Sequence, residues 1–226
     1  MLMAEATLLG IAQDGGRPQP SCQMPCCKDV KHDEVAYPTS LGLSLIDESK
    51  HLFDATRNLG EQLKIWGENN PKHVWLTHAH FGHVDGLGLF GRETIGAKGI
   101  KLHVSQKMAD LIHATPQWSL MLDQGVFEIS PFQTGDKIQF GHESIEPIIV
   151  PHRDELSDMH AFIIRGENKS LLYLPDHDTW EETLDLYGCK LIREWFEKLE
   201  IDTAFIDGTF WSQHELLGRS QAEVPH

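Results

Sequence analysis

Long apolar segments are missing from this sequence. One of its longest apolar runs, 145–150, is interrupted by Glu146 and Pro147. A membrane-spanning helix needs about 20 consecutive apolar residues, so we do not expect an integral membrane protein. The first residues, 1–5, also lack the basic segment and long apolar core of a secretory signal. We therefore expect a cytoplasmic protein without a membrane partner.

Positive charge is scarce and scattered. Lys and Arg number 19 against 34 Asp and Glu, so the formal net charge is −15, and the cations form no cluster. Such a field repels polyanions, which disfavours nucleic acid and favours a small-molecule substrate. Internal repeats and low-complexity tracts are absent too, and a hydrophobic share of 40% suits an ordinary folded chain. We predict a single domain over 1–226, with the oligomeric state open and a homodimer as one alternative.

Cysteine is also sparse, and three of the four cysteines lie close together. Cys22, Cys26 and Cys27 fall in a long segment, 13–40, that is rich in Gly and Pro, while Cys189 stands alone. Adjacent cysteines form strained disulfides, and thiols stay reduced in a protein that is not exported. The cluster indicates either a structural zinc site with a fourth ligand from elsewhere or reduced cysteines without a metal. The sequence leaves both open.

Histidine, by contrast, is abundant: the chain has 14. His78, His80 and His83 follow the apolar run 73–76, which predicts a buried strand leading through a turn into a helix. Residues two apart in an extended segment point to the same side, and imidazole is the commonest metal ligand among side chains. The pattern favours zinc at the end of the strand. Three solvated loop histidines are the alternative.

Two later apolar segments also end in residues that bind metals. His152 follows 148–151, and Asp176 follows 171–175. Loops at strand ends are common places for catalytic groups. Either residue alone would more often be a surface-loop group than a ligand. Together with the histidine motif they complete a metal set, in which His152 and the first two motif histidines bind one zinc and Asp176 bridges toward a second.

Strands and helices alternate irregularly along the chain. Apolar and β-branched runs predict strands, and apolar residues at a spacing of three to four predict amphipathic helices. The expected helices cover 57–68, 87–93, 106–114, 181–186 and 191–199. We assign 126–129, 137–140 and 144–150 to a second sheet, and we expect a hairpin of 160–165 and 170–174. This order indicates two sheets packed face to face with helices outside.

The ordered set of ligands resembles the metallo-β-lactamase fold superfamily, which has His-x-His-x-x-His, then a strand-end histidine, then a strand-end aspartate. Four further features narrow the resemblance to one branch of the superfamily. They are the glycine-bearing segment 8–16, Pro18, the cysteine cluster and the later segment 202–210. They are similar to the branch that contains pyrroloquinoline quinone biosynthesis protein B and the phosphonate-pathway cyclic phosphodiesterase. In those relatives a cysteine-rich loop holds a structural zinc.

The resemblance implies an α/β protein with the four-layer αββα sandwich of the superfamily, here lacking its C-terminal elements. It also implies one or two zinc ions in the active site and a further structural zinc at the cysteines. The metal ligands expected on this basis are His78, His80, His83, His152, Asp176, Cys22, Cys26 and Cys27.

The chain departs from the superfamily pattern in two places. The motif usually reads His-x-His-x-Asp-His, and Gly82 stands in the place of its aspartate. That aspartate helps to hold the second metal in the superfamily, so the second metal site of this chain lacks a ligand. Asp85, three residues later, would compensate only if the start of the helix were distorted. The last metal histidine of the family follows a further strand, before which this sequence ends. Either the chain is incomplete or the second site is built differently.

The resemblance also implies catalytic roles for Asp176, Asp207 and His226. Asp176 would orient the attacking water or bridge two metals. In the ribonuclease Z branch, an acidic residue in a segment similar to 206–210 pairs with a later histidine as a proton relay. Asp207 and His226 are expected to form that pair here. In the alternative, Asp207 caps a loop and His226 is a frayed terminal residue.

Three functions are compatible with this set. The first is a zinc-dependent hydrolase of a small phosphodiester or ester that uses a metal-activated water. The second is a metal-dependent redox or cofactor-biosynthesis protein related to pyrroloquinoline quinone synthesis, for which one redox-active iron or copper would suit. The third is a non-catalytic metal-binding protein, which the missing aspartate keeps open. The superfamily hydrolyses phosphodiesters, thioesters, lactones and lactams, so the fold does not choose the substrate.

Overall fold

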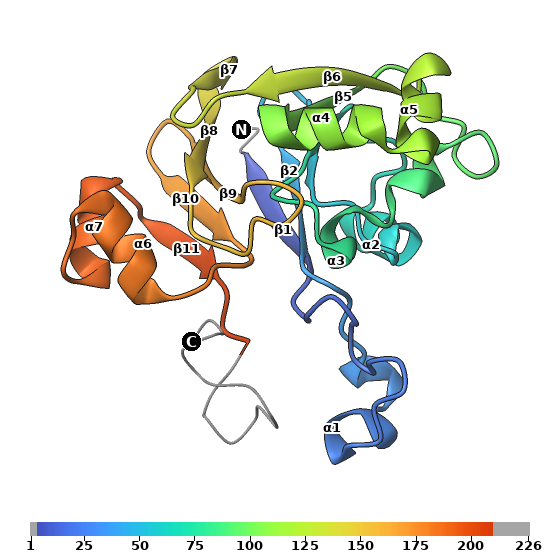
Figure 1. Cartoon of the computed structure of the whole chain (residues 1–226), viewed down its shortest axis with the longest axis horizontal. Helices are drawn as coiled ribbons and strands as arrows, with labels where there is room; N and C mark the ends of the chain where they lie inside the picture. The colour runs from blue at the N-terminus through green and yellow to red at the C-terminus, as the bar shows by residue number, and fades with distance from the viewer. Residues whose placement is uncertain (1–3, 210–226) are drawn as a thin grey trace. The chain divides into compact units, whose positions relative to one another are not determined.

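The structure, a computed structural model, describes residues 4–209. The chain divides into two units, Met1–Phe132 and Gln133–His226. Each unit contains one β-sheet with helices (Figure 1), which confirms the predicted α/β class with two sheets. Within the described range, no helix combines the length and the apolar character that crossing a bilayer requires. The single domain over 1–226 stays a prediction.

The first unit has a six-stranded sheet in the order β1-β2-β3-β4-β5-β6. Its strands are β1 (Glu5–Gly10), β2 (Ser40–Ser44), β3 (Lys50–Phe53), β4 (His73–Trp75), β5 (Ile100–Ser105) and β6 (Phe127–Phe132). The pairs β1–β2 and β2–β3 are antiparallel, whereas β3 to β6 run parallel to one another. Parallel neighbours end at the same edge of a sheet, so the loops that follow β3 and β4 meet there.

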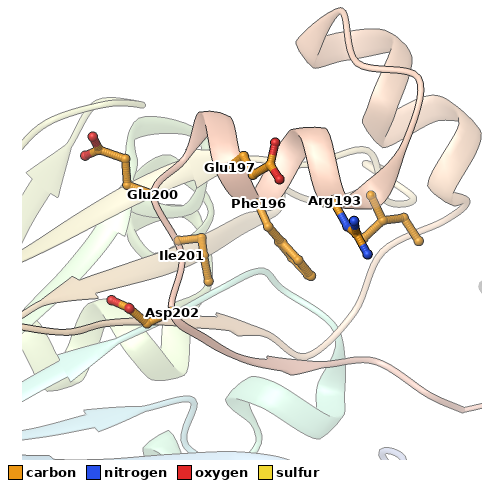
Figure 2. Close-up of a pocket in the computed structure, with 7 residues that line it drawn as sticks. Arg193, Phe196, Glu197, Glu200, Ile201 and Asp202 are labelled. Atoms are coloured by element: carbon orange, nitrogen blue, oxygen red, sulfur yellow. The ribbon is translucent and has the colours of Figure 1, made fainter.

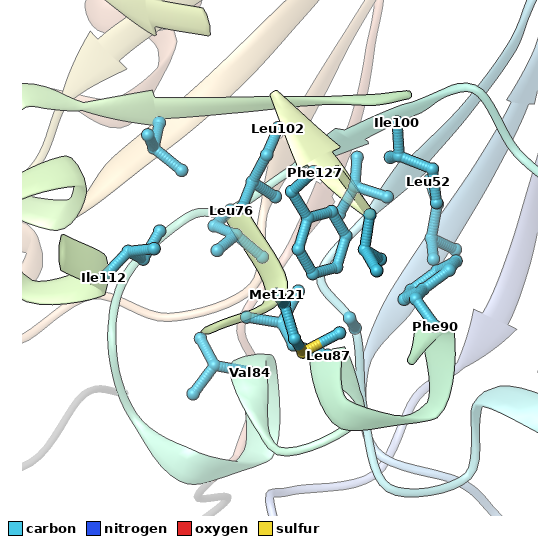
Figure 3. Packing of buried hydrophobic residues seen from close by; sticks show 14 of the residues in the cluster. Leu52, Leu76, Val84, Leu87, Phe90, Ile100, Leu102, Ile112, Met121 and Phe127 are labelled. Carbon is cyan, nitrogen blue, oxygen red and sulfur yellow. The ribbon is translucent and has the colours of Figure 1, made fainter. Parts of the chain in front are cut away.

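Helices pack on one face of this sheet. They are α2 (Leu59–Trp66), α3 (Phe81–Val84), α4 (Gln106–Ala114) and α5 (Pro116–Asp123), with a short 3-10 helix at Leu87–Phe90. The short helix α1 (Pro25–Lys28) and the 3-10 helix His32–Glu34 belong to the long N-terminal loop and bury no residue. Figure 3 shows the core that results, in which Leu52 and Leu102 of the sheet pack with Phe90 and Ile112. Burial of each such side chain stabilises the fold by about 1.5–3 kcal/mol, and the core fixes the strand ends that carry the site.

The strand at 126–129 was assigned to the wrong sheet. It is part of β6, which pairs in parallel with β5 in the first unit. The sequence analysis had assigned no element to the segment that forms α5, in which Pro116 stands at the start of the helix, where Pro is favoured. A strand, a helical connection and a parallel strand form one right-handed unit, so the two helices between β5 and β6 return the chain to the same sheet.

The second unit has a five-stranded sheet in the order β11-β10-β9-β8-β7. Its elements are β7 (Ile138–Phe140), β8 (Glu143–Ile149), β9 (His160–Arg165), β10 (Ser170–Leu174), α6 (Trp180–Tyr187), α7 (Ile192–Lys198) and β11 (Thr203–Ile206). The predicted hairpin of β9 and β10 is confirmed. β11 joins the edge in parallel with β10, with Leu174 opposite Ile206. Trp195 of α7 is fully buried against the sheet residues Ala161 and Leu172.

Candidate metal centre

The first two motif histidines lie together beyond the end of β4. Nε2 of His78 is 2.9 Å from Nδ1 of His80, as their spacing of two residues predicts. Nδ1 of His78 lies 3.0 Å from the hydroxyl of Thr77, which donates its own proton to the carboxylate of Asp54. The hydroxyl therefore accepts from Nδ1 of His78, which leaves Nε2 with the lone pair that a metal requires.

Asp54 contacts two residues of the motif segment, and the sequence analysis did not single it out. It follows β3, is fully buried and has a positive φ of 61°, a conformation that Asp tolerates better than most residues. Its carboxylate accepts hydrogen bonds from the backbone N–H of Thr77 at 2.9 Å and from Nδ1 of His83 at 2.8 Å. A buried carboxylate requires such partners. The signal was present, since Asp54 ends an apolar strand as Asp176 does.

Backbone hydrogen bonds join the loop after β3 to the motif. The N–H of Ala55 donates to the carbonyl of His83 at 2.8 Å, and the N–H of Gly86 donates to the carbonyl of Ala55 at 2.8 Å. The approach is so close that a Cβ on Gly86 would lie 2.0 Å from the carbonyl oxygen of Thr56. Only glycine fits at this position, and the loop–loop contact places His83 beside Asp54.

The two carboxylates that flank His83 have different partners. Oδ1 of Asp14, an exposed residue of the long N-terminal loop, lies 3.5 Å from Nε2 of His83. Asp85 instead forms an ion pair with Arg57 at 2.8 Å. Burial raises the pKa of Asp85 above its ordinary value, against the lowering effect of Arg57. Asp14 was not recognised as a site residue, because nothing in its local sequence connects it to the motif.

In the second unit, His152 and Asp176 lie together. Nε2 of His152, which is buried, is 3.9 Å from Oδ2 of Asp176. Nδ1 of the same ring is 3.1 Å from Oδ1 of Asp178, so the ring donates from Nδ1 and keeps the lone pair on Nε2. Between the two aspartates, burial lowers the pKa of the His177 ring. The second unit therefore presents an imidazole and a carboxylate, and Asp178 is an orienting group that the sequence reasoning missed.

Asp207 lies at the end of β11, on the same sheet edge as the segment after β10. Its N–H donates to the carbonyl of Leu174 at 2.8 Å, and its Oδ1 accepts from the N–H of Thr209 at 2.8 Å. The second contact is a local turn of the kind that aspartate commonly makes. His226 lies outside the described residues, so the relay between the two stays a prediction.

The cysteine cluster forms in the N-terminal loop around α1. The sulfur atoms of Cys22, Cys26 and Cys27 all lie within 4.8 Å of one another, and all three are free thiols. Sγ of Cys27 accepts a hydrogen bond from the N–H of Gln19 at 3.4 Å, and this contact is the main cause that lowers the pKa of Cys27. In the range 4–209, no fourth His, Asp or Glu side chain joins the group. The three converging thiols supply three of the four ligands that a structural zinc takes.

Comparison with known proteins identifies the family of the chain. Residues 45–226 match the family described as the Beta-lactamase superfamily domain. The chain belongs to this family. The match spans the motif histidines, His152 and Asp176, so the resemblance drawn from the motifs is confirmed. Membership supports the prediction of a metal-dependent hydrolase.

Solved structures share the fold at low sequence identity. Zn²⁺-bound PqqB from Methylobacterium extorquens aligns over 91% of this chain and 73% of its own, with a TM-score of 0.70 and 17% identity. A diphosphatase from the PhnP family aligns over 91% of this chain and 85% of its own, with a TM-score of 0.63 and 17% identity. YhfI from Bacillus subtilis aligns over 82% and 67%, with a TM-score of 0.57 and 14% identity. No curated protein matches the chain. These likenesses confirm the predicted metallo-β-lactamase fold.

A surface cavity of about 670 Å³ lies elsewhere, between α7 and the start of β11. Figure 2 shows Phe196 and Ile201 on its apolar side, with Arg193, Glu197 and Asp202 around them. None of its lining residues belongs to the candidate metal ligands.

Proposed function

We propose that the protein is a zinc-dependent hydrolase of a small phosphodiester or ester. The observation that carries the proposal is the pair of converging imidazoles, His78 and His80, whose ring nitrogens lie 2.9 Å apart at the end of a buried strand. In our proposal they bind one zinc with His152, and Asp176 bridges toward a second metal. Three imidazole nitrogens with water in the open position are a ligand set that catalytic zinc uses.

The protein's own groups orient these ligands. Thr77 holds Nδ1 of His78, and Asp178 holds Nδ1 of His152, so that each ring offers Nε2. Partners of this kind fix the tautomer of a ligating histidine and strengthen metal binding about 10–100-fold. When bound, zinc supplies a hydroxide near neutral pH, because it lowers the pKa of a coordinated water to about 7.

The charge of the chain favours a small substrate. At a net charge of −15 the long-range field opposes a polyanion such as RNA, whereas a small monoanionic diester carries little charge to repel. The fold is that of Zn²⁺-bound PqqB and of a diphosphatase, and the second of these supports phosphorus–oxygen chemistry here. We further propose that Asp207 helps to protonate the leaving group, with His226 as its partner.

A substrate screen tests the hydrolase. Zinc-loaded and manganese-loaded protein would be assayed with bis(p-nitrophenyl) phosphate, a phosphomonoester, a lactone and a thioester. We expect metal-dependent turnover of the diester, lost by at least about 100-fold in His80→Ala because a metal ligand is missing. The exposed His113 of α4 supplies the matched control, and His113→Ala should keep full activity. Turnover that is equal with and without metal, or unchanged in His80→Ala, would contradict the assignment as a metal-dependent hydrolase.

One observation favours a second function. Gly82 replaces the aspartate that helps to hold a second metal, and a single redox-active iron held by histidines would suit oxygen chemistry in cofactor biosynthesis. Elemental analysis of protein purified without added metal separates the two functions. Zinc supports the hydrolase, and stoichiometric iron with no turnover in the substrate screen supports the redox protein. Metal binding with neither activity supports a non-catalytic role.

A further inference from the structure

The carboxylate of Asp14 lies where the side chain of residue 82 would begin. A Cβ on Gly82 would be 2.2 Å from Oδ1 of Asp14, 2.4 Å from its Cγ and 2.7 Å from its Cα. Such distances are impossible for a real Cβ. Position 82 therefore cannot carry a side chain while the N-terminal loop is in place, and a carboxylate from another segment lies in the space that the usual aspartate leaves.

Asp14 is also placed correctly relative to His83. Its Oδ1 is 3.5 Å from Nε2 of His83. Two ligands of one tetrahedral zinc, each about 2.0–2.1 Å from the metal, are separated by about 3.3 Å. Because Nδ1 of His83 donates to Asp54 at 2.8 Å, the lone pair of the neutral ring is on Nε2. The pair thus offers one oxygen and one nitrogen at the separation that a shared metal requires.

The other nearby carboxylate, that of Asp85, has one oxygen engaged by Arg57 and does not belong to any group that could hold a metal ion among the described residues. Asp85 was the residue that the sequence offered as a substitute for the missing aspartate. In the structure, its Oδ2 forms an ion pair with Arg57 at 2.8 Å, and it follows the regular turn of α3 without distortion, with its N–H bonded to the carbonyl of Phe81 at 3.0 Å. The condition under which Asp85 would compensate is therefore not met.

Backbone contacts hold the turn that carries Asp14. The N–H of Gly16 donates to the carbonyl of Gln13 at 2.7 Å, and the N–H of Arg17 donates to the carbonyl of Ala36 at 2.7 Å. Nε of Arg17 in turn donates to the carbonyl of Cys26 at 2.9 Å. The turn is thus tied to the loop that contains the cysteine cluster, and a metal at the cysteines would steady Asp14 as well.

We infer that Asp14 and His83 are ligands of a second metal ion, and that Asp14 takes the place of the aspartate that Gly82 has removed. This inference rests on the proposed function, since the ring of His83 lies 4.3 Å from that of His78 and the second ion would lie beside the one that His78 and His80 bind. The N-terminal loop then has two roles: it carries the thiol cluster and it supplies one ligand of the active site.

Counting bound Mn²⁺ tests the inference. Mn²⁺ prefers oxygen and nitrogen donors to thiolates, so the cysteine cluster does not enter the count. Wild type, Asp14→Asn and the control Asp85→Asn would be stripped of metal, saturated with Mn²⁺ and analysed by elemental analysis and EPR. We expect two ions in wild type with the exchange-coupled spectrum of a pair about 3.5–4 Å apart. We expect one ion and a mononuclear spectrum in Asp14→Asn, and wild-type behaviour in Asp85→Asn.

Further variants separate the possible failures. Gly82→Ala should also lose one ion, because its Cβ displaces the turn of Asp14, while His80→Ala should lose the first site. Two ions in Asp14→Asn, or one ion in Asp85→Asn, would overturn the inference. A single ion in wild type would overturn it too and leave the proposed function standing. Wild type that binds neither Mn²⁺ nor Zn²⁺ outside the cysteines would remove the proposed function itself. Asp14 is exposed, so Asp14→Asn is expected to fold, which a thermal melt checks.

Discussion

Nδ1 of His83 donates a hydrogen bond to Oδ2 of Asp54 at 2.8 Å, and both side chains are buried. The two residues come from the loops after adjacent parallel strands, β4 and β3. The same carboxylate accepts from the backbone N–H and the hydroxyl of Thr77. One buried anion thereby fixes both the backbone before His78 and the ring orientation of His83.

The charge of Asp54 is expected to matter more than its shape. Asn in its place keeps the size and tolerates the positive φ, but it weakens the hold on His83 and removes a negative charge from the site. We expect the affinity for metal to fall about 10–100-fold, measured by competition with a chelator, with the thermal midpoint of the metal-free protein changing far less. An unchanged metal affinity would show that Asp54 has only a structural role.

The first-site histidines should be necessary for metal but not for folding. His78→Ala and His80→Ala are each expected to lose active-site zinc, because two imidazoles of the proposed set converge at 2.9 Å and each variant removes one of them. Elemental analysis provides the count, and circular dichroism checks the fold. His113→Ala should retain the full zinc content. Zinc retained by both first-site variants would refute the assignment.

The thiol cluster should be protected by metal. Cys22, Cys26 and Cys27 converge within 4.8 Å, so a bound zinc would block all three from alkylation. We expect a chelator to expose them and to make the segment 13–40 sensitive to protease. Cys189, half-buried in the second unit, is the internal control and should react at the same rate with or without metal. Rapid labelling of all three thiols in metal-replete protein would exclude the structural zinc.

Stability should fall on the acid side because two buried histidines resist protonation. Burial lowers the pKa of His51 to about 2 and that of His103 to about 3, whereas unfolded histidine titrates near 6.5. Below pH 6.5 the unfolded state binds protons that the folded state does not. Stability is therefore complete above pH 6.5 and is lost as pH falls toward 3, by up to about 1.4 kcal/mol per pH unit for each histidine.

Urea unfolding of metal-free protein at several pH values measures this slope. His103→Gln should lower stability at all pH values but show a flatter dependence between pH 6.5 and 5, since one proton-linked group is gone. The exposed His113 again provides the control, and His113→Gln should keep the wild-type slope. The explanation fails if His103→Gln and wild type have parallel pH profiles.

Replacement by alanine at two glycines near the motif should change the free energy of unfolding in opposite directions. A Cβ on Gly86 would lie 2.0 Å from the backbone oxygen of Thr56, whereas a Cβ on Gly88 meets nothing within 4 Å. Gly86→Ala must move the loop after β3 and is expected to cost about 1–3 kcal/mol or more. Gly88→Ala should be neutral or slightly stabilising. Equal unfolding free energies for the two variants would contradict the close approach of the loops.

The sequence by itself determined the ligand types and where they lie along the chain. These are local features, since the geometry of a few consecutive residues sets each strand, its polar terminal residue and the placement of His78 and His80 on one side. The same holds for the hairpin of β9 and β10, whose strands are joined by a short turn. The superfamily followed from this order of motifs.

Only the tertiary structure decided which distant groups join the motif. Asp14 and Asp54 reach His83 because the order of the sheet and the path of the N-terminal loop bring three separate segments together, and no local periodicity encodes such an encounter. The same reason explains why β6 was assigned to the wrong sheet. Strand pairing is chosen by the packing of the helices between strands, so a strand's own residues do not reveal its neighbours.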